Sequence, residues 1–191
     1  TKKVEPLTKE FDPNIKSVQW SVSDNNLYAL CENKDQVSVF RLDMTEKKGQ
    51  RNGKWEMLQL NEPYISGSIS LAKEKPMMVY TGLSGETTDH SWVLDLKKNK
   101  HTSLTDLNPT RLAGIAMGTC NEWTYKTKRG DSITGCYYLP PYFDETKQYP
   151  MLVYYYGGVT PVGRLLESPY NYQAWAAMGY VVYVLQPSGC T

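Results

Sequence analysis

Residues 149–158 read YPMLVYYYGG, and this stretch decides how the fold is interpreted. From Met151 to Tyr156 every residue is apolar or aromatic, which is typical of a strand that is covered on both faces. Gly157 and Gly158 follow at once, and glycine adopts backbone conformations that other residues avoid. The stretch therefore predicts a buried strand that ends in a sharp turn.

A second buried strand is predicted at 180–185, YVVYVL, and a helix precedes it at 171–178. Asn171 is a suitable N-terminal cap, and Gly179 stands where a left-handed residue commonly ends a helix. Strand, short helix and strand in this order predict a right-handed crossover between two parallel strands.

A hairpin is predicted before the first buried strand. Residues 122–127 and 133–139 have strand character and flank Lys-Arg-Gly-Asp at 128–131, where Gly130 supplies the positive φ of a tight turn. A hairpin followed by a parallel crossover is the order in which the sheet of an α/β hydrolase begins. The second half of the chain is therefore expected to form the start of such a sheet.

The first half of the chain shows short alternating strands with polar turns between them. The pattern repeats with an offset of about 50 residues, since Ser21 and Asp43 correspond to Ser70 and Asp95. Roughly four strands in a repeat of this length are typical of β-propeller blades. The predicted strands are 17–22, 27–31, 36–42, 55–60, 68–71, 77–81 and 91–96.

Only two such repeats are present, and residues 1–14 are expected to be a frayed start. Because propellers close a ring of roughly 4 to 8 blades, two blades would leave sheet edges exposed, and we expect the missing blades upstream. The predicted fold class is a β-rich α/β architecture. In it, the last blades of a β-propeller precede the first strands and helix of a truncated α/β-hydrolase sheet.

Charge and hydropathy exclude several classes of partner. The net charge is +1, so no excess charge attracts nucleic acid or an anionic membrane surface. The longest apolar runs are far shorter than the roughly 20 residues of a membrane-spanning helix. We therefore expect neither nucleic acid nor a membrane as a partner.

The cysteine pattern predicts no metal site. Cys31, Cys120, Cys136 and Cys190 form no C-x-x-C pair, and they lie far along the sequence from both histidines. Buried thiols are the favoured interpretation. Such thiols are compatible with the cytoplasm and with a bacterial periplasm, so they leave the compartment open.

Three motifs carry a resemblance to a known family: the stretch 149–158, Gly-Tyr-Val-Val at 179–182 and Gln-Pro-Ser-Gly at 186–189. Together with the blades they resemble the prolyl oligopeptidase family of serine peptidases, especially its dipeptidyl-peptidase and acylaminoacyl-peptidase-like bacterial members. The resemblance implies that residues 1–114 are the C-terminal blades of a propeller. It also implies that residues 115–191 are the N-terminal part of an α/β-hydrolase catalytic domain.

The implied substrates are short peptides, because in this family the propeller covers the active site. The Ser-Asp-His triad of the family would lie downstream of this chain, which contains no Gly-x-Ser-x-Gly motif. His90 and His101 belong to the blade region and are not triad candidates. The chain alone is therefore expected to be inactive. The resemblance implies no cofactor, leaves room for a homo-oligomer of the full-length protein, and favours a periplasmic or secreted location.

Tyr156 is the candidate catalytic residue. In the branch of the family that this sequence is similar to, a tyrosine directly before the glycine pair donates its hydroxyl hydrogen to the oxyanion of acyl transfer. A tyrosine hydroxyl is protonated at neutral pH and can serve as this donor. The competing interpretation is that Tyr154, Tyr155 and Tyr156 are aromatic strand residues that fill the core.

The loop that follows Tyr156 has no assigned role. Arg164 and Glu167 could contact a substrate or be solvated loop residues, and the pair Gly157-Gly158 lacks the spacing of a phosphate-binding loop. The full-length protein could also be a non-catalytic relative that has lost its nucleophile and serves as a scaffold. A stand-alone propeller is disfavoured by the hydrolase-like end of the chain.

Overall fold

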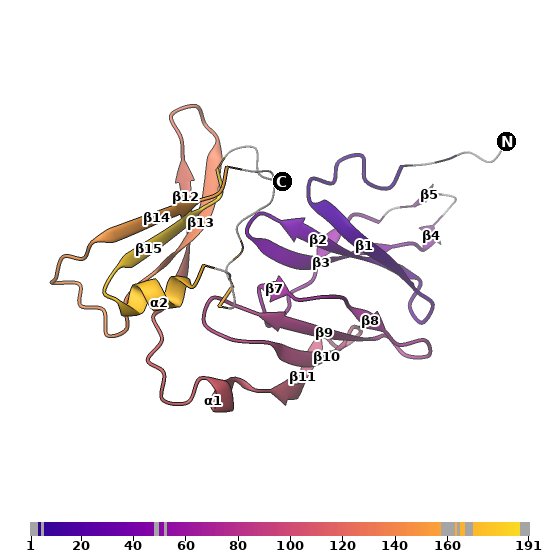
Figure 1. The fold of residues 1–191 in the computed structure, drawn as a ribbon. Helices are drawn as coiled ribbons and strands as arrows, with labels where there is room; N and C mark the ends of the chain where they lie inside the picture. The colour runs from indigo at the N-terminus through magenta and orange to yellow at the C-terminus, as the bar shows by residue number, and fades with distance from the viewer. Residues whose placement is uncertain are drawn as a thin grey trace.

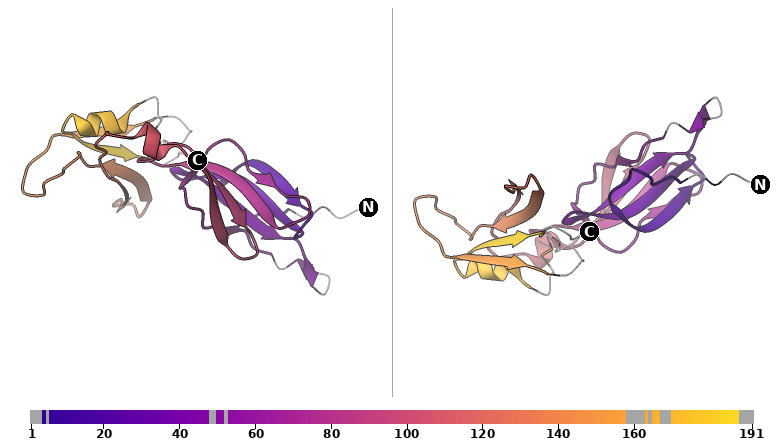
Figure 2. Two further views of the ribbon diagram at one scale, coloured as in Figure 1. Left: turned by 90° about the horizontal axis from the view of Figure 1, so that it is seen from below. Right: turned by 90° about the horizontal axis from the view of Figure 1, so that it is seen from above.

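The structure is a computed structural model, and it describes residues 4, 6–47, 50–51, 53–157, 163, 165–166 and 170–187. The described part contains a nine-stranded sheet, a four-stranded sheet and a two-stranded ribbon (Figure 1). The two larger sheets lie side by side along the long dimension of the molecule (Figure 2). The ribbon consists of β4 (Glu46–Lys47) and β5 (Gln50–Arg51).

An antiparallel meander of four strands forms the first part of the nine-stranded sheet. Asn25 and Lys34 take positive φ values of 56° and 59° in its two tight turns. The predicted strands are confirmed here, except that 55–60 contributes only two paired residues. The strands are β1 (Asn14–Ser21), β2 (Asn26–Asn33), β3 (Gln36–Asp43) and β6 (Glu56–Met57).

A second antiparallel meander has the same order of strands. Its members β8, β9, β10 and β11 correspond in turn to β1, β2, β3 and β6, so the predicted repeat is present in the structure. The last of them was not predicted, because its side chains are mostly polar and exposed. The strands are β8 (Ser70–Leu71), β9 (Met77–Leu83), β10 (His90–Asp95) and β11 (Lys100–Asp106).

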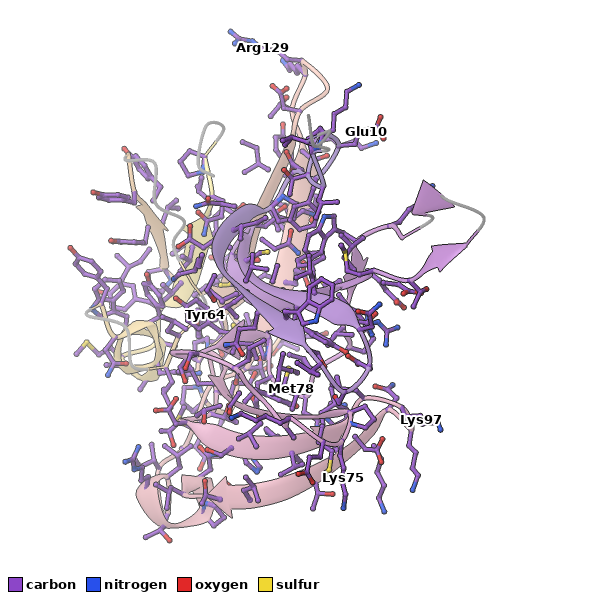
Figure 3. All side chains as sticks on the ribbon, turned by 90° about the vertical axis from the view of Figure 1, so that its right-hand side faces the viewer. Glu10, Tyr64, Lys75, Met78, Lys97 and Arg129 are labelled. Carbon is purple, nitrogen blue, oxygen red and sulfur yellow. The ribbon has the colours of Figure 1, made fainter. Side chains whose placement is uncertain are left out.

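A short strand, β7 (Tyr64–Ile65), joins the two meanders into one sheet. Val37 of β3 pairs with Tyr64 in parallel, and β7 pairs antiparallel with β9. One face of each meander then contributes to a common core. Met78 lies between the strands of the two meanders in Figure 3. The buried members of this core are Tyr28, Leu30, Val37, Val39, Ile65, Ile69, Met78, Tyr80 and Leu94.

The outer face of the first meander is also covered, and this corrects the expectation of a frayed start at residues 1–14. Phe11 packs against Phe40 and Trp55, with ring centroids 5.0 Å apart in each pair. The indole Nε1 of Trp55 donates a hydrogen bond to the carbonyl of Leu7 at 2.9 Å. Apolar burial thus holds the described residues before β1 on the sheet, which the polar composition of this segment did not indicate.

The second sheet has the order β12-β13-β15-β14. Its first two strands form the predicted hairpin, and β14 and β15 pair in parallel as expected. The helix α2 (Tyr172–Ala177) lies between them in sequence; Asn171 caps it and Gly179 follows with a φ of 92°. The strands are β12 (Cys120–Lys126), β13 (Ser132–Tyr138), β14 (Met151–Tyr155) and β15 (Val181–Leu185).

The expectation that β14 is covered on both faces was wrong. Met151, Val153 and Tyr155 are 60%, 53% and 66% exposed, whereas Leu152 and Tyr154 pack toward the core of this sheet. The physical reason is that α2 covers one face of the sheet, and no described residue covers these side chains on the other. Alternation of the side chains along a strand then exposes every second residue of an apolar run.

A short helix, α1 (Asn108–Arg111), lies in the connection between the two sheets. A hydrogen bond attaches α1 to the nine-stranded sheet, since the amide of Thr88, between β9 and β10, donates to Asn108 Oδ1 at 2.6 Å. No helix in the described ranges is long and apolar enough to span a membrane.

Cys31, Cys120 and Cys136 form no disulfide. Cys31 and Cys136 are buried, as expected, and Cys120 is partly buried. Burial raises the pKa of Cys31 to about 11. Cys190 lies outside the described residues.

Buried tyrosines predict a loss of stability at high pH. Burial raises the pKa of Tyr80 from 10.0 to about 12, and burial likewise raises the pKa values of Tyr28 and Tyr138. A folded-state pKa above the unfolded value favours the neutral phenol, so the stabilisation is complete below pH 10 and is lost as the pH rises toward 12.

We therefore expect the free energy of unfolding, measured by denaturant titration, to fall between pH 10 and 12. Tyr80→Phe should reduce the steepness of this fall, because the variant has no phenol to ionise at that position. Tyr142→Phe is the matched control, since Tyr142 is 91% exposed. An equal slope in all three proteins would contradict this assignment.

Candidate functional site

Tyr156 lies directly after the last residue of β14, at the carboxyl end of the parallel pair. Tyr155 pairs with Leu185, so the chain leaves both parallel strands at the same edge of the sheet. In open α/β sheets, ligands bind in the crevice outside the carboxyl ends of the strands. The position of Tyr156 is therefore that of a ligand-binding edge.

The three consecutive tyrosines have different surroundings. Tyr154 packs on the α2 side, with its ring centroid 4.8 Å from that of Tyr170 and 5.6 Å from that of Tyr172. Tyr155 points to the opposite face and is 66% exposed, and Tyr156 is 50% exposed. The core-filling interpretation thus fits Tyr154 and does not fit Tyr155 or Tyr156.

The phenols at this edge interact with one another. Partial burial, a hydrogen bond with Tyr170 and the nearby hydroxyls of Tyr170 and Tyr156 raise the pKa of Tyr154. The Tyr156 hydroxyl is thus near enough to that of Tyr154 to affect its pKa. Tyr156 itself is half exposed to solvent.

The aromatic packing continues into the core of the sheet. The ring of Tyr172, in the first turn of α2, lies 5.4 Å from that of the buried Tyr138 on β13 and 5.8 Å from that of Trp175. Aromatic pairs at these separations stabilise a fold beyond the area they bury. These ring contacts fix α2 against the sheet and hold the side chain of Tyr154 between the helix and the strands.

The glycine pair after Tyr156 is only partly described. A Cβ built on Gly157 would meet no described atom within 4 Å, so crowding does not require glycine at this position. Gly158, Arg164 and Glu167 lie outside the described residues, and the predictions made for them stay predictions. The site as described therefore consists of Tyr156, its aromatic neighbours and the ends of β14 and β15.

Both histidines lie in the nine-stranded sheet and bond to residues of that sheet. His101 Nδ1 is 2.9 Å from the hydroxyl of Tyr80, and His90 Nε2 is 2.9 Å from Ser103 Oγ. The imidazole of His90 also stacks on Trp92 at 4.0 Å, and its Nδ1 lies 3.7 Å from Glu62 Oε1. Burial raises the pKa of Glu62 and lowers that of His101.

The ranges that the structure describes contain no group of three or more His, Cys, Asp and Glu side chains arranged to hold a metal ion. Tyr156 presents a half-exposed phenol, whose hydroxyl can donate a hydrogen bond. Such a donor stabilises negative charge that develops on a substrate oxygen.

Sequence reasoning missed one residue near this site. Gln173 of α2 is buried and bonds to main-chain groups of the segments 84–88 and 117–119. In the sequence it reads as an ordinary helix former, and nothing in its spacing distinguishes it. Only the packing of the two sheets reveals its contacts.

Known proteins share this fold. No protein-family model matches the chain. Dipeptidyl-peptidase 5 of Porphyromonas gingivalis is 24% identical over 173 residues, which cover 90% of this chain and 24% of that protein. The acylaminoacyl peptidase structure of Pyrococcus horikoshii matches with a TM-score of 0.73 at 16% identity, covering 99% of this chain and 28% of its own.

Dipeptidyl peptidase 4 of Porphyromonas gingivalis matches with a TM-score of 0.58 at 20% identity, covering 91% of this chain and 24% of its own. The chain therefore spans about a quarter of the length of these relatives. Over that quarter, the β-rich fold expected from the sequence is the fold of these peptidases.

The N-terminal cap of α2 provides a test of how this helix, which packs on Tyr154, is stabilised. Asn171 Oδ1 accepts a hydrogen bond from the amide of Ala174 at 2.9 Å. Asn171→Ala should lower the free energy of unfolding by about 1 kcal/mol, measured by denaturant titration, because the first turn loses its acceptor. Asn171→Asp keeps an acceptor oxygen and should stay close to the unsubstituted chain. A loss of equal size in both variants would show that the cap is not the cause.

Proposed function

We propose that this chain, which is similar to peptidases of the prolyl oligopeptidase family, forms the junction between the propeller and the catalytic domain of a longer serine peptidase. The proposal is supported by the share of the relatives that the chain spans and by its two sheets of different construction. The substrates we propose are short peptides.

In this proposal residues 1–114 are propeller blades and residues 115–191 begin the hydrolase domain. The two meanders support the first assignment, because each has four antiparallel strands and they bury a common core. The parallel pair β14–β15 with its helix supports the second. The blades would limit the size of peptides that reach the carboxyl end of the parallel strands.

The proposed chemistry is acyl transfer. A serine outside this chain attacks the scissile carbonyl, a histidine takes the serine proton, and an aspartate orients that histidine. Negative charge then develops on the carbonyl oxygen. The hydroxyl of Tyr156 donates a hydrogen bond to this oxyanion, which requires a separation of about 2.7–3.1 Å in the transition state.

A single observation carries the role of Tyr156. It is half exposed at the carboxyl end of the parallel strands, whereas its neighbours Tyr154 and Tyr155 are packed and turned away, respectively. A donor is useful to catalysis when it is held in place before the charge develops.

We expect Tyr156→Phe in the full-length protein to lower kcat by roughly 10², the range for the loss of one oxyanion donor, with a smaller effect on KM. Chromogenic dipeptidyl and aminoacyl substrates measure both constants. Tyr155→Phe is the matched control, since this neighbouring hydroxyl faces the other side of the sheet and its removal should leave kcat unchanged. An unchanged kcat in Tyr156→Phe would return Tyr156 to a structural role.

The chain alone should not hydrolyse these substrates. Its sequence has no Gly-x-Ser-x-Gly motif, and both of its histidines bond within the nine-stranded sheet. Turnover is measured with and without a serine-directed inhibitor such as a fluorophosphonate. Inhibitor-sensitive hydrolysis by the purified 191-residue chain would refute the proposal that the nucleophile lies elsewhere.

A further inference from the structure

Gln173 bonds to the main chain of two segments that lie far from it in the sequence. Its Oε1 accepts from the amide of Gly118 at 2.9 Å, and its Nε2 donates to the carbonyls of Gly85 at 2.9 Å and Gly118 at 3.0 Å. The residue is 7% exposed. Only one orientation of the side-chain amide satisfies all three groups, because two are acceptors and one is a donor.

These two segments belong to different sheets and meet at the boundary between the sheets, which we call the seam. Gly85 lies in the turn 84–87 that follows β9, and Gly118 lies just before β12. Both approach their neighbours closely: a Cβ on Gly85 would lie 2.6 Å from Cys120 Sγ, and one on Gly118 would clash with the carbonyl oxygen of Leu139. Glycine is therefore needed here for the segments to come within reach of Gln173.

Hydrogen bonds within the turn 84–87 hold its conformation. Ser84 Oγ accepts hydrogen bonds from the amides of Glu86 and Thr87 at 3.1 and 3.0 Å. Glu86 Oε1 in turn accepts a hydrogen bond from the amide of Cys120. The turn is thus fixed internally and is attached to the first residue of the second sheet.

The same turn also binds the segment between β14 and α2. The amide of Leu166 donates to the carbonyl of Ser84 at 2.8 Å. Leu166 therefore bonds to the residue next to Gly85, which Gln173 contacts. Leu166 and Gln173 are thus both bonded to one turn, which follows β9 of the nine-stranded sheet.

We propose that Gln173 is a positioning residue that fixes the first turn of α2 against the turn 84–87. Tyr172, its neighbour in α2, packs on Tyr154 and so supports the end of β14 that carries Tyr156. The role of Gln173 in catalysis rests on the function proposed above. Its role in holding α2 against the turn rests on its own hydrogen bonds alone. A displacement of about 1 Å at a catalytic group lowers rates by as much as roughly 10², so such support has a measurable consequence.

Gln173→Met tests the proposal, because methionine has a similar length and helix propensity but cannot make the three hydrogen bonds. Gln19→Met is the matched control. Gln19 Nε2 donates to the carbonyl of Ile69 at 2.8 Å, so the same substitution removes a similar bond within the nine-stranded sheet. Gln173→Glu is a second variant, which keeps the acceptor for the Gly118 amide and carries the test should the methionine variant not fold.

Two measurements are made on the full-length protein. Amide hydrogen exchange, followed by mass spectrometry, should become faster at Gly118 and Leu166 in Gln173→Met. In Gln173→Glu it should become faster at Leu166, with a smaller change at Gly118. The value of kcat should fall roughly tenfold or more in Gln173→Met while KM changes less. Gln19→Met should alter neither the exchange at Leu166 nor kcat.

The two proposals fail in different ways. Unchanged exchange at Leu166 overturns the positioning role, whether or not the protein is a peptidase. Faster exchange with an unchanged kcat in an active enzyme also overturns it. A full-length protein without peptidase activity refutes the proposed function, and the exchange at Leu166 then decides the role of Gln173 alone.

Discussion

The turn 84–87 is the contact on which the relation between the two sheets depends. Its main-chain carbonyls accept hydrogen bonds from Gln173 and Leu166, and Glu86 binds the first residue of β12. Buried main-chain groups must find partners, because an unpaired one costs about as much as a lost hydrogen bond. Each partner here comes from the other side of the seam. The two sheets therefore satisfy each other's polar main-chain groups when they pack.

The four-stranded sheet has one covered and one uncovered face in the described chain. On the covered face, Tyr138, Tyr154, Tyr172 and Trp175 form a continuous aromatic packing between the strands and α2. On the other face, Met151, Val153 and Tyr155 are more than half exposed, and Trp123 is 46% exposed. Contiguous apolar surface of this kind marks a contact region. An uncovered apolar face agrees with the partial length of the chain, which spans about a quarter of its relatives.

Local patterns predicted much of the fold. The hairpin, the crossover and the capped helix α2 were predicted because Gly130, Asn171 and Gly179 carry local conformational preferences that tertiary contacts did not override. The strand β11 was missed because its polar side chains follow no apolar alternation. Its ladder with β10 holds it in place, and main-chain hydrogen bonds leave no trace in side-chain periodicity.

The sequence by itself determined the order of the elements and the repeat of the two meanders, because both follow from patterns of residue types along the chain. It made Tyr156 a candidate only through the resemblance to the peptidase family. The tertiary structure decided which face of β14 is exposed, which of the three tyrosines packs into the core, and that Gln173 bonds to Gly85 and Gly118. These bonds join residues that are 88 and 55 positions apart. Their partners are main-chain groups, which every residue type except proline presents alike, so no side-chain pattern in the sequence could have revealed them.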